Sequence, residues 1–306
     1  MDSRASSYLF RKPSFPYIVY VSSYNPLSSG VRALHLLCHA LNRIGHEAYV
    51  MAGVTDPWLV TPTAHTIRRG QFSADGRPAI VVYPEVIEDN PLNEPVVARW
   101  LLNKPGALVE NWDGDYQPDD MIFHYDPDFL PEGLKGSLLH LPTSDIGVYN
   151  NIDNPHDKSR QGYALYTSRY RATGEPIADF LRDATVISPD NPRTPRQLAE
   201  IYRRSEFLFA YERSAATLEA TFCGCPVIYL ESSLLREIPA QKTFGKAGFA
   251  WGFSEAEAKR AKETVHETWE IYQGLLNSFD DQLARFVEVT QERARQISES
   301  AVSVRA

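Results

Sequence analysis

The segment Phe209–Leu230 holds the residues of this 306-residue chain whose types and order most clearly suggest chemistry. Its pattern predicts a buried strand, a short polar turn and then a helix whose N-terminus lies at the carboxyl edge of a sheet. N–H groups in the first turn of a helix are unpaired and lie at the positive end of the helix dipole, which suits a diphosphate. Four residues occupy that turn: Ser214, Ala215, Ala216 and Thr217. The hydroxyls of Ser214 and Thr217 add donors, although Ser214 is equally explained as a plain helix N-cap.

Two glutamates flank this turn. Glu212 precedes it, and Glu219 lies seven residues later on the predicted helix. A helical continuation would bring both carboxylates towards one side. Because a carboxylate beside a nucleotide commonly accepts the ribose hydroxyls, Glu219 is a candidate ribose ligand. The alternative is a solvated glutamate on a helix surface.

Three arginines are available to neutralise a diphosphate. Arg169 and Arg171 lie in the loop 168–174, directly after a predicted strand, and Arg213 adjoins the turn itself. Their positive charge would stabilise the negative charge that develops on a leaving diphosphate. Arginines are also common on protein surfaces, so ordinary surface charge is the alternative for each.

Alternating strands and helices must position these residues. In the second half, strands are predicted at 163–167, 185–188, 207–211 and 227–230, and helices at 195–204 and 214–222. In the first half, strands are predicted at 17–21, 47–51, 79–83, 107–109, 121–125 and 138–141, and helices at 31–45 and 94–102. This alternation predicts an α/β fold of parallel sheets with helices on both faces.

A polar connector divides the two halves. Residues 142–160 are rich in Asn, Asp, Pro, Ser and Gly and lack an apolar period. We therefore expect one Rossmann-like domain over residues 1–150 and a second over residues 151–253.

The remaining residues, 254–306, are predicted to be helical. Their apolar positions from Val265 to Phe286 alternate spacings of four and three, which makes a narrow stripe that needs a partner. The partner is either the N-terminal domain, reached by a crossover, or a second chain. Bulky aromatic residues such as Trp269 and Phe279 favour the crossover, because two-stranded coiled coils prefer Ile, Val and Leu.

Composition excludes several classes of protein. The 31 Lys and Arg against 39 Asp and Glu give a net charge of -8, which argues against nucleic acid as a partner. Three cysteines are too few for a disulfide framework or a zinc cage. The sequence has no signal-peptide core and no run of about 18 apolar residues. We therefore expect a cytoplasmic protein with at most peripheral membrane contact.

The segment YERSAATLEATFCGCPVIY resembles the donor-site signature of GT-B glycosyltransferases, particularly bacterial enzymes that build polysaccharides. The segment around Ser28-Ser29-Gly30-Val31 is similar to the first loop and helix of the same superfamily. Likewise, VVYPEVIEDNPLNEPVVARWLLNKPG resembles a stretch of bacterial surface-polysaccharide transferases. The resemblance implies two Rossmann-like doubly wound domains that face a cleft, with C-terminal helices that cross back to the N-terminal domain.

The resemblance also implies roles for the donor-side residues. Glu219 would bind the donor ribose, Glu212 would face the transferred sugar as the catalytic residue, and residues 213–217 would hold the diphosphate. Arg169 and Arg171 lie where such enzymes place cations against phosphates. Retaining members of the family space their two glutamates one residue further apart than this chain does, so retention and inversion of the anomeric centre both stay open.

The acceptor is expected in the N-terminal domain. Ser29 and Gly30, at the head of the first helix, would line its site, because glycine permits close approach of the backbone to a ligand. His124 and Asp145 end predicted strands and could take a proton from an acceptor hydroxyl. A structural histidine and a turn-forming aspartate are the alternatives.

One short segment imitates a metal site. Asp113-Gly114-Asp115 matches the Asp-x-Asp pattern of the other large glycosyltransferase fold, in which a metal bridges the donor phosphates. It lies among turn residues in the first domain, so we interpret it as a loop and expect neither a metal nor another cofactor.

These features together predict a glycosyltransferase that moves a sugar from a nucleotide sugar to a saccharide or lipid-linked saccharide in glycan assembly. One alternative is a nonhydrolysing sugar-nucleotide epimerase, for which the sequence offers no clear set of acids and bases. Another is a binding module of the same fold with a degenerate site.

Overall fold

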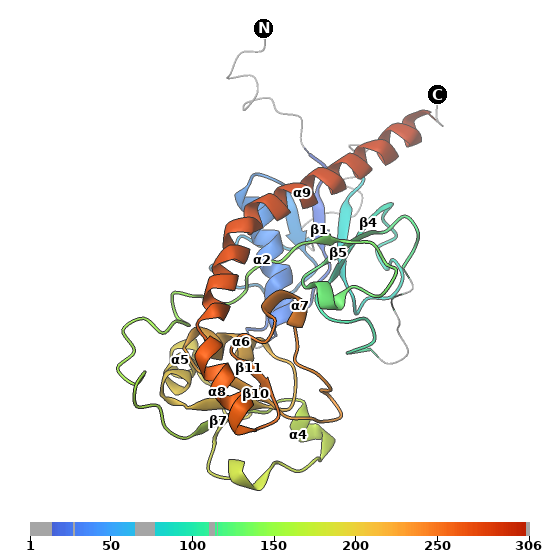
Figure 1. Cartoon of the computed structure of the whole chain (residues 1–306). Helices are drawn as coiled ribbons and strands as arrows, with labels where there is room; N and C mark the ends of the chain where they lie inside the picture. Colours follow the sequence, from blue (N-terminus) through green and yellow to red (C-terminus); the bar gives the residue numbers. More distant parts are fainter. Residues whose placement is uncertain (1–13, 27, 65–76, 110–113, 115, 304–306) are drawn as a thin grey trace. The chain divides into compact units, whose positions relative to one another are not determined.

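A computed structural model of the chain describes residues 14–26, 28–64, 77–109, 114 and 116–303 (Figure 1). The chain forms two compact units: unit 1 is Met1–Leu141 with Phe279–Ala306, and unit 2 is Pro142–Ser278. Unit 2 starts before the predicted boundary at residue 151, because Tyr149 packs into its core and Ser144 hydrogen-bonds through its backbone to the Tyr272 hydroxyl.

Unit 1 contains a six-stranded parallel sheet with the order β2-β1-β3-β4-β5-β6. The strands are β1 (Tyr17–Val19), β2 (Ala48–Val50), β3 (Ile80–Pro84), β4 (Val96–Leu101), β5 (Met121–His124) and β6 (Ser137–Leu138). The strands β3 and β4 are buried along their whole length, as in parallel sheets covered on both faces. Helix α2 (Ser29–Arg43) follows β1 and packs Leu34, Cys38 and Leu41 into the core.

The predicted helix at 94–102 is wrong, because these residues form β4. Val96 and Val97 are β-branched and favour a strand. Since β4 is buried between β3 and β5, its residues do not alternate between apolar and polar, so periodicity could not separate it from a buried helix. The predicted strand at 107–109 is also wrong, because these residues lie in an irregular turn region.

Unit 2 contains a five-stranded parallel sheet with the order β11-β10-β9-β7-β8. The strands are β7 (Tyr163–Tyr166), β8 (Thr185–Ile187), β9 (Phe207–Ala210), β10 (Val227–Tyr229) and β11 (Phe249–Trp251). The helices are α4 (Tyr170–Thr173), α5 (Pro195–Arg204), α6 (Ala215–Phe222), α7 (Gln241–Phe244) and α8 (Glu255–Thr264). The structure also contains two short 3-10 helices, η2 (Pro127–Phe129) in unit 1 and η3 (Asp179–Leu181) in unit 2.

The predicted C-terminal helical region is divided into α8 and a long helix, α9 (Glu267–Ser303), with a turn at 265–266 between them. The apolar stripe is packed within both units. Tyr272 is buried in the core of unit 2, and Leu283 and Phe286 are buried in the core of unit 1. The stripe therefore requires no second chain.

The C-terminal half of α9 is attached to the rest of unit 1 by hydrogen bonds as well as by packing. The Tyr17 hydroxyl lies 2.8 Å from Thr290 Oγ1, and the Gln291 amide pairs with both backbone groups of Phe15. Within the part of the chain that the structure describes, no helix is both long enough and apolar enough to cross a membrane.

We expect Phe286→Ala to destabilise the protein by about 3 to 5 kcal/mol, as for large-to-small changes in a packed core. The Phe286 ring is fully buried and lies 4.7 Å from the Phe123 ring and 5.8 Å from the Tyr17 ring, centroid to centroid. Thermal and denaturant unfolding would measure the loss. The exposed helix position Glu288→Ala is the control, and an equal effect of the two changes would contradict the packing described here.

Candidate functional site

The most suggestive site lies at the carboxyl edge of the sheet in unit 2. Strand β7 is flanked by β8, the next strand along the chain, and by β9, so the strand order reverses at β7. In open parallel sheets, ligands bind outside the carboxyl ends of the strands at such a reversal. The loops after β7 and β9 contain the predicted donor-side residues Arg169, Glu212, Arg213 and Ser214.

Glu212 joins these two loops. Its carboxylate accepts hydrogen bonds from the backbone N–H groups of Ser168 (2.5 Å), Arg169 (3.2 Å) and Tyr170 (3.1 Å). The Arg169 Nε also donates to it at 3.2 Å, and only 1% of the Glu212 side chain is exposed. Stacking of the Tyr170 and Tyr211 rings, with centroids 4.3 Å apart, further ties the loops together. Both Glu212 oxygens are therefore used inside the protein, which suits a residue that positions the loops.

The N-terminus of α6 follows directly from the second loop. The Ser214 side chain caps the helix by accepting from the Ala216 N–H at 3.2 Å. The Thr217 hydroxyl is buried, donates to the Ser214 carbonyl at 2.6 Å and accepts from the Tyr229 hydroxyl at 2.8 Å. Thr217 therefore supports the turn through its side chain, and Ala216 donates its N–H to the cap. Ser214 and Ala215 lie at the helix start, where N–H groups are oriented outwards.

The predicted cations differ in their surroundings. Arg169 is half exposed and, besides Glu212, donates through Nη2 to the Arg213 carbonyl at 3.1 Å. Arg171 forms an ion pair with Asp190 at 2.6 Å, and both side chains are exposed. Arg169 and Arg213 are thus held in the loop pair, whereas Arg171 lies on α4 and is engaged with the segment after β8.

The helical continuation that would bring Glu212 and Glu219 towards one side is not formed. Glu212 lies in the turn before α6 and contacts the loop after β7, whereas Glu219 is buried in α6 near Tyr202 of α5. Burial raises the pKa of the Tyr202 hydroxyl, and the nearby Glu219 raises it further. The helix begins at Ala215, so no helical period connects Glu212 to Glu219.

The acceptor-side candidates Ser29 and Gly30 lie at the carboxyl edge of the sheet in unit 1. Strand β1 is flanked by β2 and β3, so the strand order reverses there as well. Ser28 caps α2, and Ser29 and Gly30 form its first turn. A Cβ added to Gly30 would lie 3.9 Å from the Leu102 Cδ1, so the start of α2 packs over the segment that follows β4.

Glu85, which sequence reasoning missed, lies at the same edge directly after β3. Its side chain is buried, and its Oε2 accepts from the Leu102 N–H at 2.9 Å. Burial raises the pKa of this carboxyl to about 7, and hydrogen bonds from backbone N–H groups only partly offset the effect. The sequence signal for Glu85 was its position immediately after the buried run Ile80–Pro84.

The two other candidate bases belong to different units. His124 ends β5 and is buried. Asp145 belongs to unit 2, and its Oδ1 accepts from the Gly147 N–H at 2.8 Å, as in an Asx turn. This turn agrees with the alternative that Asp145 is a turn-forming aspartate.

The Asp-x-Asp segment is not informative here, because Asp113 and Asp115 lie outside the described residues. Among the residues that the structure does describe, no group of three or more His, Cys, Asp and Glu side chains could hold a metal ion.

Comparison with known proteins gives a likeness in structure alone. No protein-family model and no curated protein sequence matches the chain. A glycosyltransferase from Rickettsia africae ESF-5 is 10% identical, with 92% of this chain and 98% of that chain aligned at a TM-score of 0.51. The glycosyltransferase SnogD from Streptomyces nogalater is 12% identical, with 90% and 99% aligned and a TM-score of 0.47. The glycosyltransferase VinC in complex with DTDP is 13% identical, with 89% and 100% aligned and a TM-score of 0.46.

The fold is that of the GT-B glycosyltransferases, with two Rossmann-like units built on parallel sheets. At these identities the likeness establishes the fold, and the chemistry must be argued from the residues.

Proposed function

We propose that the protein is a glycosyltransferase that moves a sugar from a nucleotide-sugar donor to a hydroxyl of a saccharide acceptor. The observation that carries the proposal is the pair of loops after β7 and β9, which Glu212 holds together beside the start of α6. A rigid pair of loops at a reversal of strand order is suited to hold a nucleotide diphosphate. The GT-B fold supports this assignment. The sequence resemblance to GT-B enzymes implies a donor site at this same edge of the second domain.

In this proposal the N–H groups at the start of α6 and the guanidinium groups of Arg169 and Arg213 bind the donor diphosphate. Their positive charge would stabilise the leaving nucleoside diphosphate, and the acceptor oxygen would bond to the anomeric carbon as the bond to the phosphate oxygen breaks. Glu212 acts through Arg169 and the loop backbone, which makes it a positioning residue. Glu219 is retained as the proposed ribose ligand.

We further propose that Glu85 is the base. The acceptor hydroxyl must lose a proton as its oxygen attacks, and a base with a pKa near the working pH accepts that proton best. Glu85 combines a pKa of about 7 with a place at the strand reversal of unit 1, beside the segment over which α2 begins. Its position also suits an acceptor site in that unit, with Ser29 and Gly30 as its proposed lining.

The donor and the setting are proposed more broadly. UDP, GDP and dTDP sugars are the candidates, and CMP sugars, which carry a single phosphate, belong in the same screen as a contrast. Assembly of a bacterial surface glycan is the setting that the sequence resemblance suggests. The proposal requires no metal, because the phosphate charge is assigned to arginines and to a helix N-terminus.

Screening these nucleotide sugars for thermal stabilisation tests the proposal. A donor at about 100 times its Kd adds about 2.7 kcal/mol of stability, which would raise the melting temperature by several degrees. We expect Arg169→Ala to weaken the stabilisation, and Arg182→Ala to leave it unchanged, since Arg182 is exposed and pairs with Asp179 on η3.

The same donor should then show turnover with a saccharide acceptor in the presence of EDTA. Stabilisation without turnover over a broad acceptor panel would support the binding-module alternative. Turnover that is lost with EDTA and restored by manganese would contradict the assignment of the phosphates to protein groups.

A further inference from the structure

A pocket of unit 2 lies at the edge of the sheet opposite the loops after β7 and β9. Its cavity measures about 680 Å³, within the range of small-molecule sites. Glu206, immediately before β9, and Pro226, immediately before β10, both line it. Because the strands are parallel, this is the amino edge of the sheet, whereas Glu212 and Ser214 follow β9 at the carboxyl edge. The pocket is therefore separate from the proposed donor site.

Arg160 fixes one wall of this pocket. Its Nη2 donates to the Asn151 Oδ1 at 2.7 Å and to the Cys223 carbonyl at 2.8 Å, and its Nη1 donates to the Tyr202 carbonyl at 2.9 Å. Gly224 has a φ of +73°, and a Cβ there would lie 2.5 Å from the Arg160 Nη2. The wall is thus pre-formed around a guanidinium whose hydrogen bonds are made within the protein.

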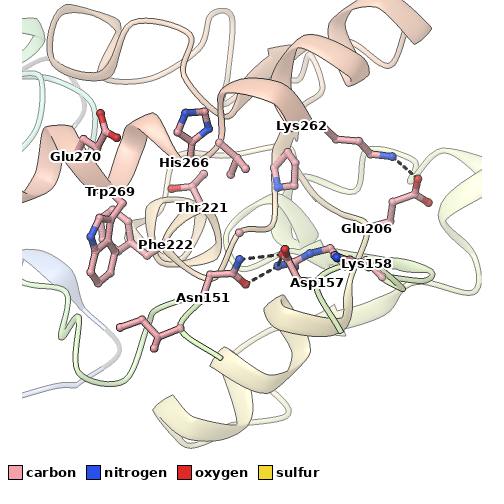
Figure 2. Close-up of a pocket in the computed structure, with 15 residues that line it drawn as sticks. Asn151, Asp157, Lys158, Glu206, Thr221, Phe222, Lys262, His266, Trp269 and Glu270 are labelled. Carbon is pink, nitrogen blue, oxygen red and sulfur yellow. Dashed lines mark hydrogen bonds and ion pairs between the residues drawn. The ribbon is translucent and has the colours of Figure 1, made fainter. Parts of the chain in front are cut away.

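The charges that line the pocket balance one another. It is lined by three cations and three carboxylates: Lys158, Arg160, Lys262, Asp157, Glu206 and Glu270. Arg160 pairs with Asp157 at 3.1 Å. Lys262 pairs with Glu206 at 2.5 Å, which is visible in Figure 2. Lys262 is held further by the Phe207 ring, with its Nζ 4.6 Å from the ring centroid. Paired charges attract a polyanion such as a diphosphate weakly, and two of the three cations, Arg160 and Lys262, already have a carboxylate partner.

Aromatic and polar groups share the remaining lining. Trp269 lies against Phe222, with ring centroids 6.1 Å apart, and is partly exposed (Figure 2). Asn151, Glu270 and His266 lie around it as planar hydrogen-bonding groups. An indole ring offers an apolar surface with one polar N–H, and one face of a pyranose ring presents C–H groups that can pack on such a surface while its hydroxyls bond to the rim.

We infer that this pocket binds a saccharide unit, with Trp269 as the surface against which the sugar ring packs. The balanced charge, the indole and the planar polar rim are the observations that favour a neutral, polyhydroxylated ligand over an anion. The inference deepens the proposed function and rests on it for the origin of the ligand, which would be a residue of the glycan that the enzyme extends. A site of this kind would hold the glycan away from the site of transfer.

Sugar binding can be measured without turnover. The probes are the methyl pyranosides of glucose, galactose, mannose and N-acetylglucosamine, titrated at millimolar concentrations into ¹⁵N-labelled protein without nucleotide. Trp269 is one of five tryptophans, and the variant Trp269→Leu assigns its indole N–H resonance. We expect at least one glycoside to shift that resonance in the wild-type protein.

Two variants and a control test the contact. Trp269→Leu should abolish binding, as detected by saturation transfer to the glycoside. Lys158→Ala changes an exposed rim residue and should weaken binding severalfold without affecting folding. Trp58→Leu removes a tryptophan that is 89% exposed and lies in unit 1, so it should leave binding unchanged.

Other outcomes overturn the inference. If inorganic pyrophosphate shifts the Trp269 resonance and no glycoside does, the pocket is an anion site; if neither shifts it, the pocket binds no ligand of this class. Failure of the proposed function would look different from failure of this inference. Glycoside binding without any nucleotide-sugar turnover would support the saccharide pocket and contradict the proposed transferase activity.

Discussion

Glu212→Ala is expected to lower the free energy of unfolding by about 3 to 5 kcal/mol, because it breaks a buried hydrogen-bond network. Three backbone N–H groups from the loop after β7 would lose their acceptor, and hydrogen bonds to a charged group contribute about 1.5 to 3 kcal/mol each. The ion pair with Arg169 adds little, because that guanidinium is half exposed. Urea unfolding followed by circular dichroism would measure the change.

Two further variants make this result specific. Glu212→Gln should lie between the wild type and Glu212→Ala, because an amide offers one acceptor oxygen and directs an NH₂ group at the other donors. Glu231→Ala, at an exposed ion pair with Arg236, should change the stability by less than about 0.5 kcal/mol. If Glu212→Ala is as stable as the wild type, the carboxylate does not hold the loops, and its oxygens are available for a ligand after all.

Glu85→Gln is expected to lower kcat/KM by about two to four orders of magnitude, which is the usual contribution of a general base. Gln keeps the shape and can still accept from the Leu102 N–H through its amide oxygen, so the fold should be retained. In the wild type, kcat/KM should rise as the pH increases through about 7, because the base acts only when it is ionised. That rise should be absent in the variant. Glu88→Gln, at an exposed position of the same segment, is the matched control.

The raised pKa of Glu85 also gives a test that does not depend on turnover. A carboxyl whose pKa is higher in the folded than in the unfolded protein binds more protons when folded, so it makes stability fall as the pH rises from about 4.5 to about 7. Relative to Glu85→Gln, the wild type should lose up to about 3 kcal/mol over that range. A stability difference that is independent of pH would show that the carboxyl titrates normally and is poorly suited to act as the base.

Sequence reasoning predicted β9, the polar turn and α6 correctly, because the run Phe207–Ala210, the turn and the helix that follows are each strong local signals. It could not show that Glu212 is oriented towards the loop after β7, since that contact joins residues 44 positions apart. The strand order that brings the loops after β7 and β9 together is likewise a tertiary property.

The misassigned strand and the missed carboxylate have related causes. Val96–Leu101 is buried on both faces, so its apolar residues have neither a helical nor a strand period. Glu85 looks like an ordinary loop residue in the sequence, and its raised pKa arises from burial among residues that follow two different strands. Sequence patterns show which residues are apolar. They do not show which loops surround a single carboxyl, and the burial of that carboxyl depends on those loops.

Helix α9 has a consequence for synthesis on the ribosome. The residues of unit 2 form one continuous stretch, Pro142–Ser278, whereas unit 1 needs Leu283, Phe286 and Ala294 to complete its core. Domains usually fold in the order in which they emerge, the N-terminal one first. Here unit 1 is completed last, because its final segment, Phe279–Ala306, is translated after all the residues of unit 2. Until that segment is made, the first part of unit 1 has an incomplete core with exposed apolar residues. We expect the protein to depend most on chaperones during this stage of synthesis.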